Sequence, residues 1–150
     1  SSSGHTLLET RAIRRLVERL LPLATVITPN IDEAVLLLDH SIAGDEEAEG
    51  ALVELLAMGA KAVLLKGGHL AGKKVIDRLD TGKGLYEFEH KRLKVSGHGT
   101  GCTLASAIAA NLALKKSLPD ACEVAGDYVF KALKGAYTPG KSGLSVLNHF

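Results

Sequence analysis

The sequence has few cysteines, almost no net charge and no long hydrophobic run. Only Cys102 and Cys122 occur in 150 residues, and their spacing fits neither a zinc site nor a disulfide framework. With 18 basic and 17 acidic residues, the net charge is +1, which excludes the broad positive field that binds nucleic acid or an anionic membrane. The longest hydrophobic runs, such as Leu20 to Ile27, are too short to cross a bilayer. We therefore expect no nucleic-acid or membrane partner and a reducing, cytoplasmic setting.

The composition is otherwise that of an ordinary globular protein. Apolar residues make up 46% of the chain and charged residues 23%, which is enough hydrophobic material for one core. No repeat, linker or low-complexity tract divides the sequence. We expect residues 1–150 to form one domain or part of one.

Helical and strand patterns alternate along the first half of the sequence. The run Thr6-Leu7-Leu8-Glu9 has the form of a capping box ahead of hydrophobic residues at helical spacing. Asn30 and Asp45 are typical helix caps, and Pro29 would stop a short β-branched strand. The predicted elements are a helix at about 6–20, a strand at 24–28, helices at 31–38 and 45–58, and a strand at 61–66. This alternation is typical of βαβ units with a parallel sheet.

The second half opens with a hairpin pattern. Two charged segments, 74–79 and 84–92, flank Asp80-Thr81-Gly82-Lys83, whose Asp and Gly suit a tight turn. Helices are expected at about 101–115 and 119–136. The predicted fold class is therefore α/β, a mainly parallel sheet flanked by helices, with an antiparallel hairpin at a water-exposed edge.

The most informative motif is Ser96-Gly97-His98-Gly99-Thr100-Gly101-Cys102-Thr103, which runs directly into a helix-favouring segment. Glycine lets the backbone turn tightly and approach a ligand, and a helix start leaves N–H groups unpaired at its positive end. The combination predicts an anion hole, suited to a phosphate or to a phosphoryl group in transit.

A second motif, Thr28-Pro29-Asn30-Ile31-Asp32-Glu33, follows a predicted strand. Asn30 and Glu33 lie three residues apart, so both can face the carboxyl end of that strand, where open α/β sheets bind ligands. A carboxylate there could hold Mg²⁺ directly or through water. Asn-x-x-Glu is equally a plain capping pair, and that alternative stays open.

A third motif, Lys66-Gly67-Gly68-His69, ends the next predicted strand. A lysine there can reach a phosphate as a point charge, and the two glycines keep the backbone low enough for a ligand to approach. The alternative is a solvated lysine before a glycine turn. His69 has no partners at metal-ligand spacing, and we interpret it as a surface or supporting residue.

These motifs, in this order, resemble the ribokinase-like family of small-molecule kinases. Thr-Pro-Asn-x-x-Glu at 28–33, Leu-Lys-Gly-Gly-His at 65–69, the glycine and cysteine run at 97–109 and the terminal Asn-His-Phe at 148–150 are similar, more narrowly, to hydroxymethylpyrimidine and phosphomethylpyrimidine kinases of thiamine biosynthesis. The resemblance covers essentially the whole chain and implies a ribokinase-like fold.

The resemblance also implies a reaction and its residues. Phosphoryl transfer from MgATP to 4-amino-5-hydroxymethyl-2-methylpyrimidine, and then to its monophosphate, is the implied activity; related members act on pyridoxal-type substrates. Gly99, Thr100 and Gly101 would form the anion hole over the γ-phosphoryl group, with Cys102 where most ribokinase-like enzymes have an aspartate base.

The same resemblance assigns the ATP and metal contacts. Glu33, with Asn30, would organise Mg²⁺ and its waters, and Lys66 would contact the ATP phosphates beside Gly68. Thr100 is counted with these nucleotide contacts as well as with the anion hole.

Two roles for Cys102 follow from its position. Helix N-termini favour thiolates, so Cys102 could accept the proton of the substrate hydroxyl. Phosphoryl transfer depends mostly on positioning and charge stabilisation, however, and a strong base is not essential. We expect that Cys102 chiefly places the hydroxyl. A small buried helix-start residue is the structural alternative, and Cys122 is interpreted as core.

Departures from the family pattern generate rival hypotheses. The segment Ser1 to His5 resembles one from the middle of the family fold, so we expect the N-terminal part of the fold to be missing and the chain to be the C-terminal portion of a kinase domain. Such a piece would associate with itself or with the missing segment. It could also be a nucleotide-binding module without catalysis. Gly126 stands where many relatives have lysine.

Two other classes are disfavoured by spacing. A cysteine phosphatase needs an arginine shortly after its nucleophile, and residues 103–115 contain none. The glycines at 97, 99 and 101 do not match the dinucleotide-binding fingerprint.

Overall fold

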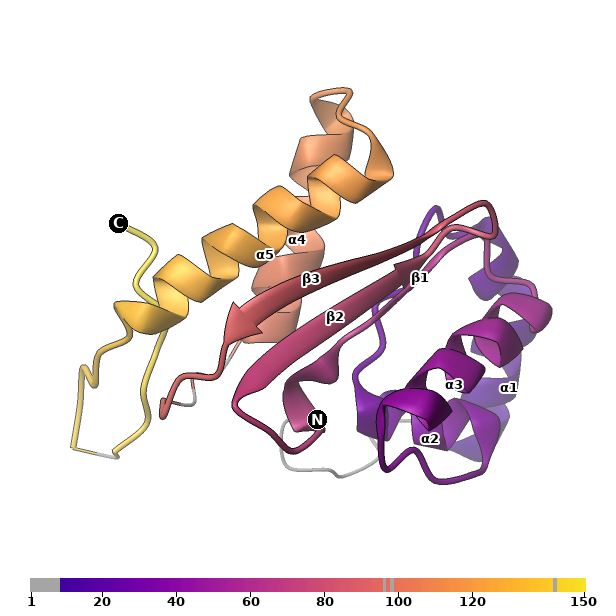
Figure 1. The fold of residues 1–150 in the computed structure, drawn as a ribbon, viewed down its shortest axis with the longest axis horizontal. Coiled ribbons are helices and arrows are strands. Elements are labelled where there is room, and N and C mark those ends of the chain that lie inside the picture. The colour runs from indigo at the N-terminus through magenta and orange to yellow at the C-terminus, as the bar shows by residue number, and fades with distance from the viewer. Residues whose placement is uncertain (1–8, 96, 98, 142) are drawn as a thin grey trace. The chain divides into compact units, whose positions relative to one another are not determined.

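The computed structural model describes residues 9–95, 97, 99–141 and 143–150 (Figure 1). They belong to two compact units, Ser1–Glu89 and His90–Phe150, and each is described by itself. Thr6, the predicted start of the first helix and of its capping box, lies outside the described residues, and the helix in the structure begins at Thr10 after an extended Glu9. The single domain expected from composition stays a prediction.

Helices of the first unit follow the predicted boundaries closely. They are α1 (Thr10–Arg19), the short 3₁₀ helix η1 (Leu21–Leu23), α2 (Ile31–Leu38) and α3 (Asp45–Ala57). Asn30 caps α2 as predicted, since its Oδ1 accepts from the Glu33 amide at 2.8 Å. The prediction that Asp45 caps α3 is wrong, because the cap is Gly44 in an extended conformation. The Asp45 carboxylate instead accepts a 2.8 Å hydrogen bond from Nη2 of Arg78, which is buried.

The sheet contains three strands in the order β1-β2-β3. Strand β1 (Val63–Leu65) pairs antiparallel with β2 (Lys74–Asp80), and β3 (Leu85–Lys91) lies beside β2 and runs the opposite way (Figure 1). The predicted hairpin is thus confirmed. In its turn, Asp80 Oδ1 accepts from the Gly82 amide at 2.7 Å, and Gly82 has a φ of +71°.

A continuous strand at 24–28 is not formed. Parallel pairing is limited to two isolated bridges, Ile27 with Val63 and Asn30 with Lys66. Pro29 lies between the bridged residues and has no amide to donate to a ladder. The parallel direction is as predicted, but the element is a bridged extended segment that delivers Asn30 to the end of β1.

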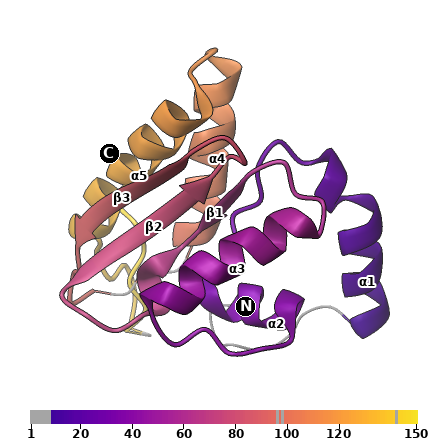
Figure 2. The same cartoon turned by 45° about the vertical axis from the view of Figure 1, so that its right-hand side comes forward.

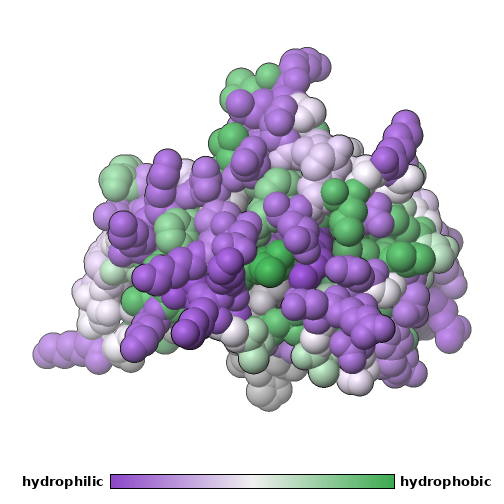
Figure 3. All heavy atoms as spheres, viewed as in Figure 1, coloured by the Kyte–Doolittle hydropathy of each residue, from purple (hydrophilic) through white to green (hydrophobic). Residues whose placement is uncertain are grey.

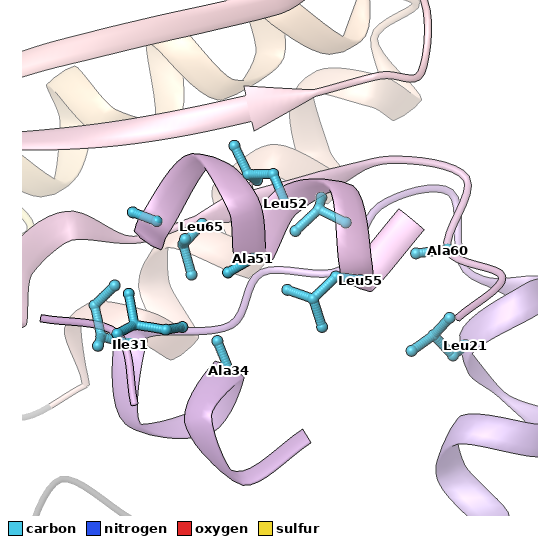
Figure 4. Packing of buried hydrophobic residues seen from close by; sticks show 11 residues of the cluster. Leu21, Ile31, Ala34, Ala51, Leu52, Leu55, Ala60 and Leu65 are labelled. Atoms are coloured by element: carbon cyan, nitrogen blue, oxygen red, sulfur yellow. The ribbon is translucent and has the colours of Figure 1, made fainter. Parts of the chain in front are cut away.

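The core of the first unit lies where α2 and α3 pack against β1 (Figures 2 and 4). Leu52 and Leu55 of α3 and Leu65 of β1 are each at most 2% exposed. Burying a leucine side chain contributes about 1.5 to 3 kcal/mol. This packing fixes the start of α2 beside the end of β1, which is where the second and third motifs meet.

The second unit is built on a helical hairpin, α4 (Thr100–Ala113) and α5 (Leu118–Lys134), which lie side by side in both ribbon views (Figures 1 and 2). Leu104 and Ile108 of α4 are buried, as are the small residues Ala121 and Ala125 of α5, which let the two helices approach closely. Ser117 caps α5 by accepting from the Asp120 amide at 3.3 Å.

Polar side chains dominate the face drawn in Figure 3, with hydrophobic residues in separate patches among them. Within the described residues, no helix is long and apolar enough to cross a membrane.

His40 links the end of α2 to α3. Its Nδ1 lies 3.2 Å from the Ser41 carbonyl oxygen and its Nε2 lies 3.1 Å from Glu54 Oε2. Acceptors at both ring nitrogens favour the doubly protonated imidazolium. The Ser41 carbonyl first, and then Glu54, raise the pKa of His40 above its ordinary 6.5.

We expect the His40 pKa to lie above 6.5 in an NMR titration, and Glu54→Gln to lower it while leaving the contribution of Ser41. Because the folded pKa is raised, the stabilisation is fully present below the unfolded pKa and is lost as pH rises through the folded pKa. The stability difference between wild type and Glu54→Gln, measured by urea unfolding, should therefore be largest below pH 6.5 and shrink as the pH rises through the raised pKa of His40. A difference independent of pH would contradict this linkage.

Candidate active site

Helix α4 begins without a side-chain cap. Its N-cap is Gly99, with φ +88° and ψ +4°, and no side chain among the described residues caps it. The left-handed conformation favours glycine, and the carbonyl of Gly99 accepts from the Thr103 amide at 2.9 Å. Since the first turn also contains no acidic residue, the positive end of the helix is not offset locally.

Helix α1 likewise has no side-chain cap and no acidic residue in its first turn, although its N-cap is Glu9 in an extended conformation, whereas the three remaining α-helices differ from α4. Helix α3 also starts after a glycine, but its first turn holds Asp45, Glu46 and Glu47. Helices α2 and α5 have side-chain caps. The predicted anion hole at Gly99, Thr100 and Gly101 lies at the one described α-helix start whose N-cap is a left-handed glycine, and its role as an anion hole stays a prediction.

Cys102 lies in this first turn and is exposed. The alternative of a small buried helix-start residue does not describe it, whereas Cys122 is buried at 2% exposure, as predicted. His98, the other residue of interest in the motif, lies outside the described residues.

An open cavity of about 570 Å³ adjoins Cys102 within the second unit. Helix α4 contributes Thr103, Ser106, Ala107, Ala110 and Asn111, and the opposite side contains Val124, Tyr128 and His149. Its surface combines apolar side chains with hydroxyl, amide, imidazole and thiol groups.

In the first unit, Asn30 and Glu33 form a complete capping box. The Glu33 carboxylate Oε2 accepts from the Asn30 amide at 2.8 Å, and Asn30 Oδ1 accepts from the Glu33 amide. The capping alternative raised by the sequence is thus what these residues do in this structure. It leaves half of the Glu33 side chain exposed, at 51%.

Lys66 lies beside Asn30 and Glu33. Its backbone bridges to Asn30, and its Nζ lies 3.8 Å from Glu33 Oε2. Only 17% of the Lys66 side chain is exposed, so this is not the solvated lysine of the alternative interpretation. The structure therefore brings Asn30, Glu33 and Lys66 together at the junction of α2 and β1.

The two glycines after Lys66 differ from each other. Residues Gly67–His69 form a short 3₁₀ helix, η2. A Cβ at Gly67 would lie 2.1 Å from the Ile76 carbonyl oxygen, so this close approach requires glycine, while Gly68 faces open space. His69 is a surface residue as expected, and its Nδ1 lies 3.1 Å from Asp32 Oδ2, a pair that the sequence analysis missed.

The residues at this junction fit a water-mediated Mg²⁺ site rather than a protein cage. Among the described residues, no cluster of three or more His, Cys, Asp or Glu side chains could hold a metal ion. Mg²⁺ usually keeps several waters and takes one or two carboxylates together with substrate phosphates. The exposed Glu33 carboxylate suits that pattern, because the neighbouring carboxylate of Asp32 pairs with His69.

Two features of the second unit had no assigned role in the sequence. Tyr128 and His149 are 21 residues apart, yet the Tyr128 hydroxyl and His149 Nδ1 lie 2.9 Å apart. His90 occupies the space beside Gly126, where a Cβ would lie 3.2 Å from its Cε1, and its Nε2 lies 3.2 Å from Asp127 Oδ1. The glycine at a position where many relatives have lysine thus makes room for an imidazole.

Comparison with known proteins places these motifs in a family. A family model described as phosphomethylpyrimidine kinase matches residues 1–146. The hydroxymethylpyrimidine/phosphomethylpyrimidine kinase of Rhizobium meliloti (strain 1021) is 43% identical over 138 residues, which are 91% of this chain and 52% of that protein. The chain spans about half the length of the curated relatives it matches.

Solved structures give the same result. A pyridoxal kinase from Staphylococcus aureus in complex with AMP-PCP and pyridoxal has a TM-score of 0.89 at 30% identity, covering 97% of this chain and 55% of that one. Phosphomethylpyrimidine kinase from Clostridium difficile 630 has a TM-score of 0.72 at 36% identity, covering 86% and 52%. The ribokinase-like fold expected from the motifs is therefore confirmed, and the chain belongs to the phosphomethylpyrimidine kinase family.

Proposed function

We propose that the protein transfers the γ-phosphoryl group of ATP to the hydroxymethyl group of 4-amino-5-hydroxymethyl-2-methylpyrimidine, and then to the phosphate of that product, in thiamine biosynthesis. The observation that carries the proposal is the uncapped start of α4, with exposed Cys102 in its first turn. Family membership supplies the reaction class, and the name of the Rhizobium meliloti relative supplies the substrates.

In this proposal the second unit stabilises the γ-phosphoryl group during its transfer. The amides of Thr100, Gly101 and Cys102 donate hydrogen bonds to the non-bridging oxygens of the phosphoryl group, where negative charge is spread in the transition state. The bond between the substrate oxygen and the γ-phosphorus forms as the bond to the β,γ-bridging oxygen breaks. Cys102 holds the hydroxyl in line, and its sulfur or a water takes the released proton.

The first unit has a separate task. Lys66 contacts ATP phosphates as a point charge, with Gly68 leaving the approach open. Glu33 would hold Mg²⁺ through water, while Asn30 keeps the Glu33 carboxylate in place. Mg²⁺, when bound, neutralises charge on the phosphates.

A pyridoxal-type kinase is the second candidate, favoured by the 0.89 TM-score to the Staphylococcus aureus pyridoxal kinase. The pyrimidine is preferred because the family model and the Rhizobium meliloti relative both carry that name. A nucleotide-binding module without catalysis is a third candidate, since the chain spans about half of its relatives.

The proposal extends to partners and setting. Leu20, Leu23 and Leu36 in the first unit and Leu114 in the second are exposed, which favours self-association or pairing with a further polypeptide segment of the family fold. Cys102 and Cys122 do not form a disulfide, which suits a cytoplasmic setting.

We expect the protein, given MgATP, to phosphorylate the hydroxymethylpyrimidine and its monophosphate with a higher kcat/KM than pyridoxal. A coupled assay of ADP release measures kcat/KM for the hydroxymethylpyrimidine, its monophosphate and pyridoxal. The assay is run on this chain and on the product of its complete reading frame. A preference for pyridoxal would select the second candidate. ATP binding by calorimetry with no transfer from either polypeptide would select the module without catalysis.

Substitution of Cys102 distinguishes its two roles. If Cys102 mainly positions the hydroxyl, Cys102→Ser keeps kcat within about tenfold of wild type, whereas Cys102→Ala lowers it by about 100-fold. Cys102→Asp then brings no gain, because base strength is not limiting. Ala105→Ser, which changes an exposed residue of α4 that does not line the cavity, is the matched control and should leave kcat unchanged. A large gain with aspartate would instead assign Cys102 the role of general base.

A further inference from the structure

The C-terminal tail, residues 146–150, folds back on α5. Val146 exchanges two backbone hydrogen bonds with Tyr137, at 2.9 and 3.1 Å, and the Asn148 amide donates to the Ala132 carbonyl at 3.0 Å. Between them, Leu147 is 6% exposed. The tail is therefore held by its backbone on both sides of one buried side chain.

Leu147 packs against the polypeptide that leads into α4. A Cβ built on Gly97 would lie 3.2 Å from Leu147 Cδ2 and 3.2 Å from Leu133 Cδ1. Gly97 is two residues before Gly99, the N-cap. The backbone at Gly97 is thus closely packed by one leucine from the tail and one from α5.

The tail also reaches the cavity beside Cys102. His149 lines this cavity together with Cys102 and Tyr128. Its ring stacks on that of Tyr128, with centroids 5.9 Å apart, and accepts or donates the 2.9 Å hydrogen bond with the hydroxyl. The tail therefore contacts Gly97 through buried Leu147 and lines the cavity at Cys102 through exposed His149.

We propose that the C-terminal tail is a positioning element for this turn: Leu147 fixes the backbone at Gly97, and the Tyr128–His149 pair holds the tail against the cavity at Cys102. The inference rests on the proposed function, which it deepens by naming residues that act through Gly97 and Gly99 without touching the transferred group. A left-handed glycine has little intrinsic conformational preference. Neighbouring packing must therefore fix the direction of the first-turn amides, and phosphoryl transfer depends on that direction.

The test compares two substitutions in the same tail. Leu147→Ala removes the contact with Gly97, whereas Phe150→Ala changes a fully exposed side chain and is the matched control. Leu147→Ala should lower kcat by about 10- to 100-fold and leave the KM for ATP within about twofold of wild type. It should also shift the NMR amide signals of Gly97, Gly99 and Gly101. Phe150→Ala should change none of these, and Leu147→Met should restore most of the kcat.

A milder variant covers the case in which Leu147→Ala does not fold. Tyr128→Phe removes only the hydroxyl bonded to His149, and the rate of Cys102 alkylation by iodoacetamide should rise as the tail loosens. Buried Cys122 serves as the internal reference. Unchanged amide signals in Leu147→Ala, or in Tyr128→Phe an alkylation rate equal to that of wild type, would overturn the inference.

The same experiment separates the two proposals. A wild-type protein that transfers no phosphoryl group but shows the amide shifts in Leu147→Ala would refute the proposed function and support the positioning role. A wild-type kinase whose Leu147→Ala variant keeps its kcat and its amide signals would refute the positioning role alone.

Discussion

The uncapped start of α4 is the constraint on which the functional interpretation depends. Helix termini normally have their free amides satisfied by a capping side chain, by nearby acidic residues or by water. Among the described residues, α2, α3 and α5 use one of the first two devices, whereas α1 and α4 use neither, and of those two only α4 begins at a left-handed glycine. A left-handed Gly99 costs little there and leaves the first-turn amides for an anion. We therefore propose that this turn serves a ligand rather than the stability of the helix.

The first unit shows how one residue can combine a structural and a chemical task. Glu33 completes the capping box through Oε2, and the Lys66 ammonium lies 3.8 Å from the same atom. Capping orders the carboxylate without burying it, since the side chain remains 51% exposed. A carboxylate held in this way suits the outer contacts of Mg²⁺, which favours water in its coordination shell. The capping and metal interpretations of the motif are therefore compatible.

Local patterns in the sequence were sufficient for much of the fold. The hairpin turn at Asp80 and Gly82, the cap at Asn30 and the boundaries of α2 all depend on residues close together in the chain. The predicted strand at 24–28 was wrong because strand propensity does not reveal how many ladder bonds form around Pro29. Asp45 was misread as a cap because its real partner, Arg78, is 33 residues away.

Some features of the candidate site could likewise be predicted from local sequence, and others could not. The glycine and cysteine motif could be predicted because its chemistry is contained in six consecutive residues, and the structure gives it an exposed thiol and a left-handed glycine. The burial of Lys66 and the pairing of Tyr128 with His149 could not be predicted from the sequence, because both depend on packing between distant segments. The contact of Leu147 with Gly97 also joins distant segments, so it could not be predicted from the sequence. The local feature that goes with it is the glycine itself, because a larger residue would meet Leu133 and Leu147.

The central claim is that the amides after Gly99 stabilise the transferred phosphoryl group. Its most direct test is the kcat of Gly99→Ala compared with that of Gly82→Ala. Both glycines have positive φ and open space at the Cβ position, so both substitutions strain the backbone by about 1 to 2 kcal/mol. If the claim is right, Gly99→Ala lowers kcat by about 100-fold or more, while Gly82→Ala stays close to wild type. Equal kcat values in the two variants would contradict it.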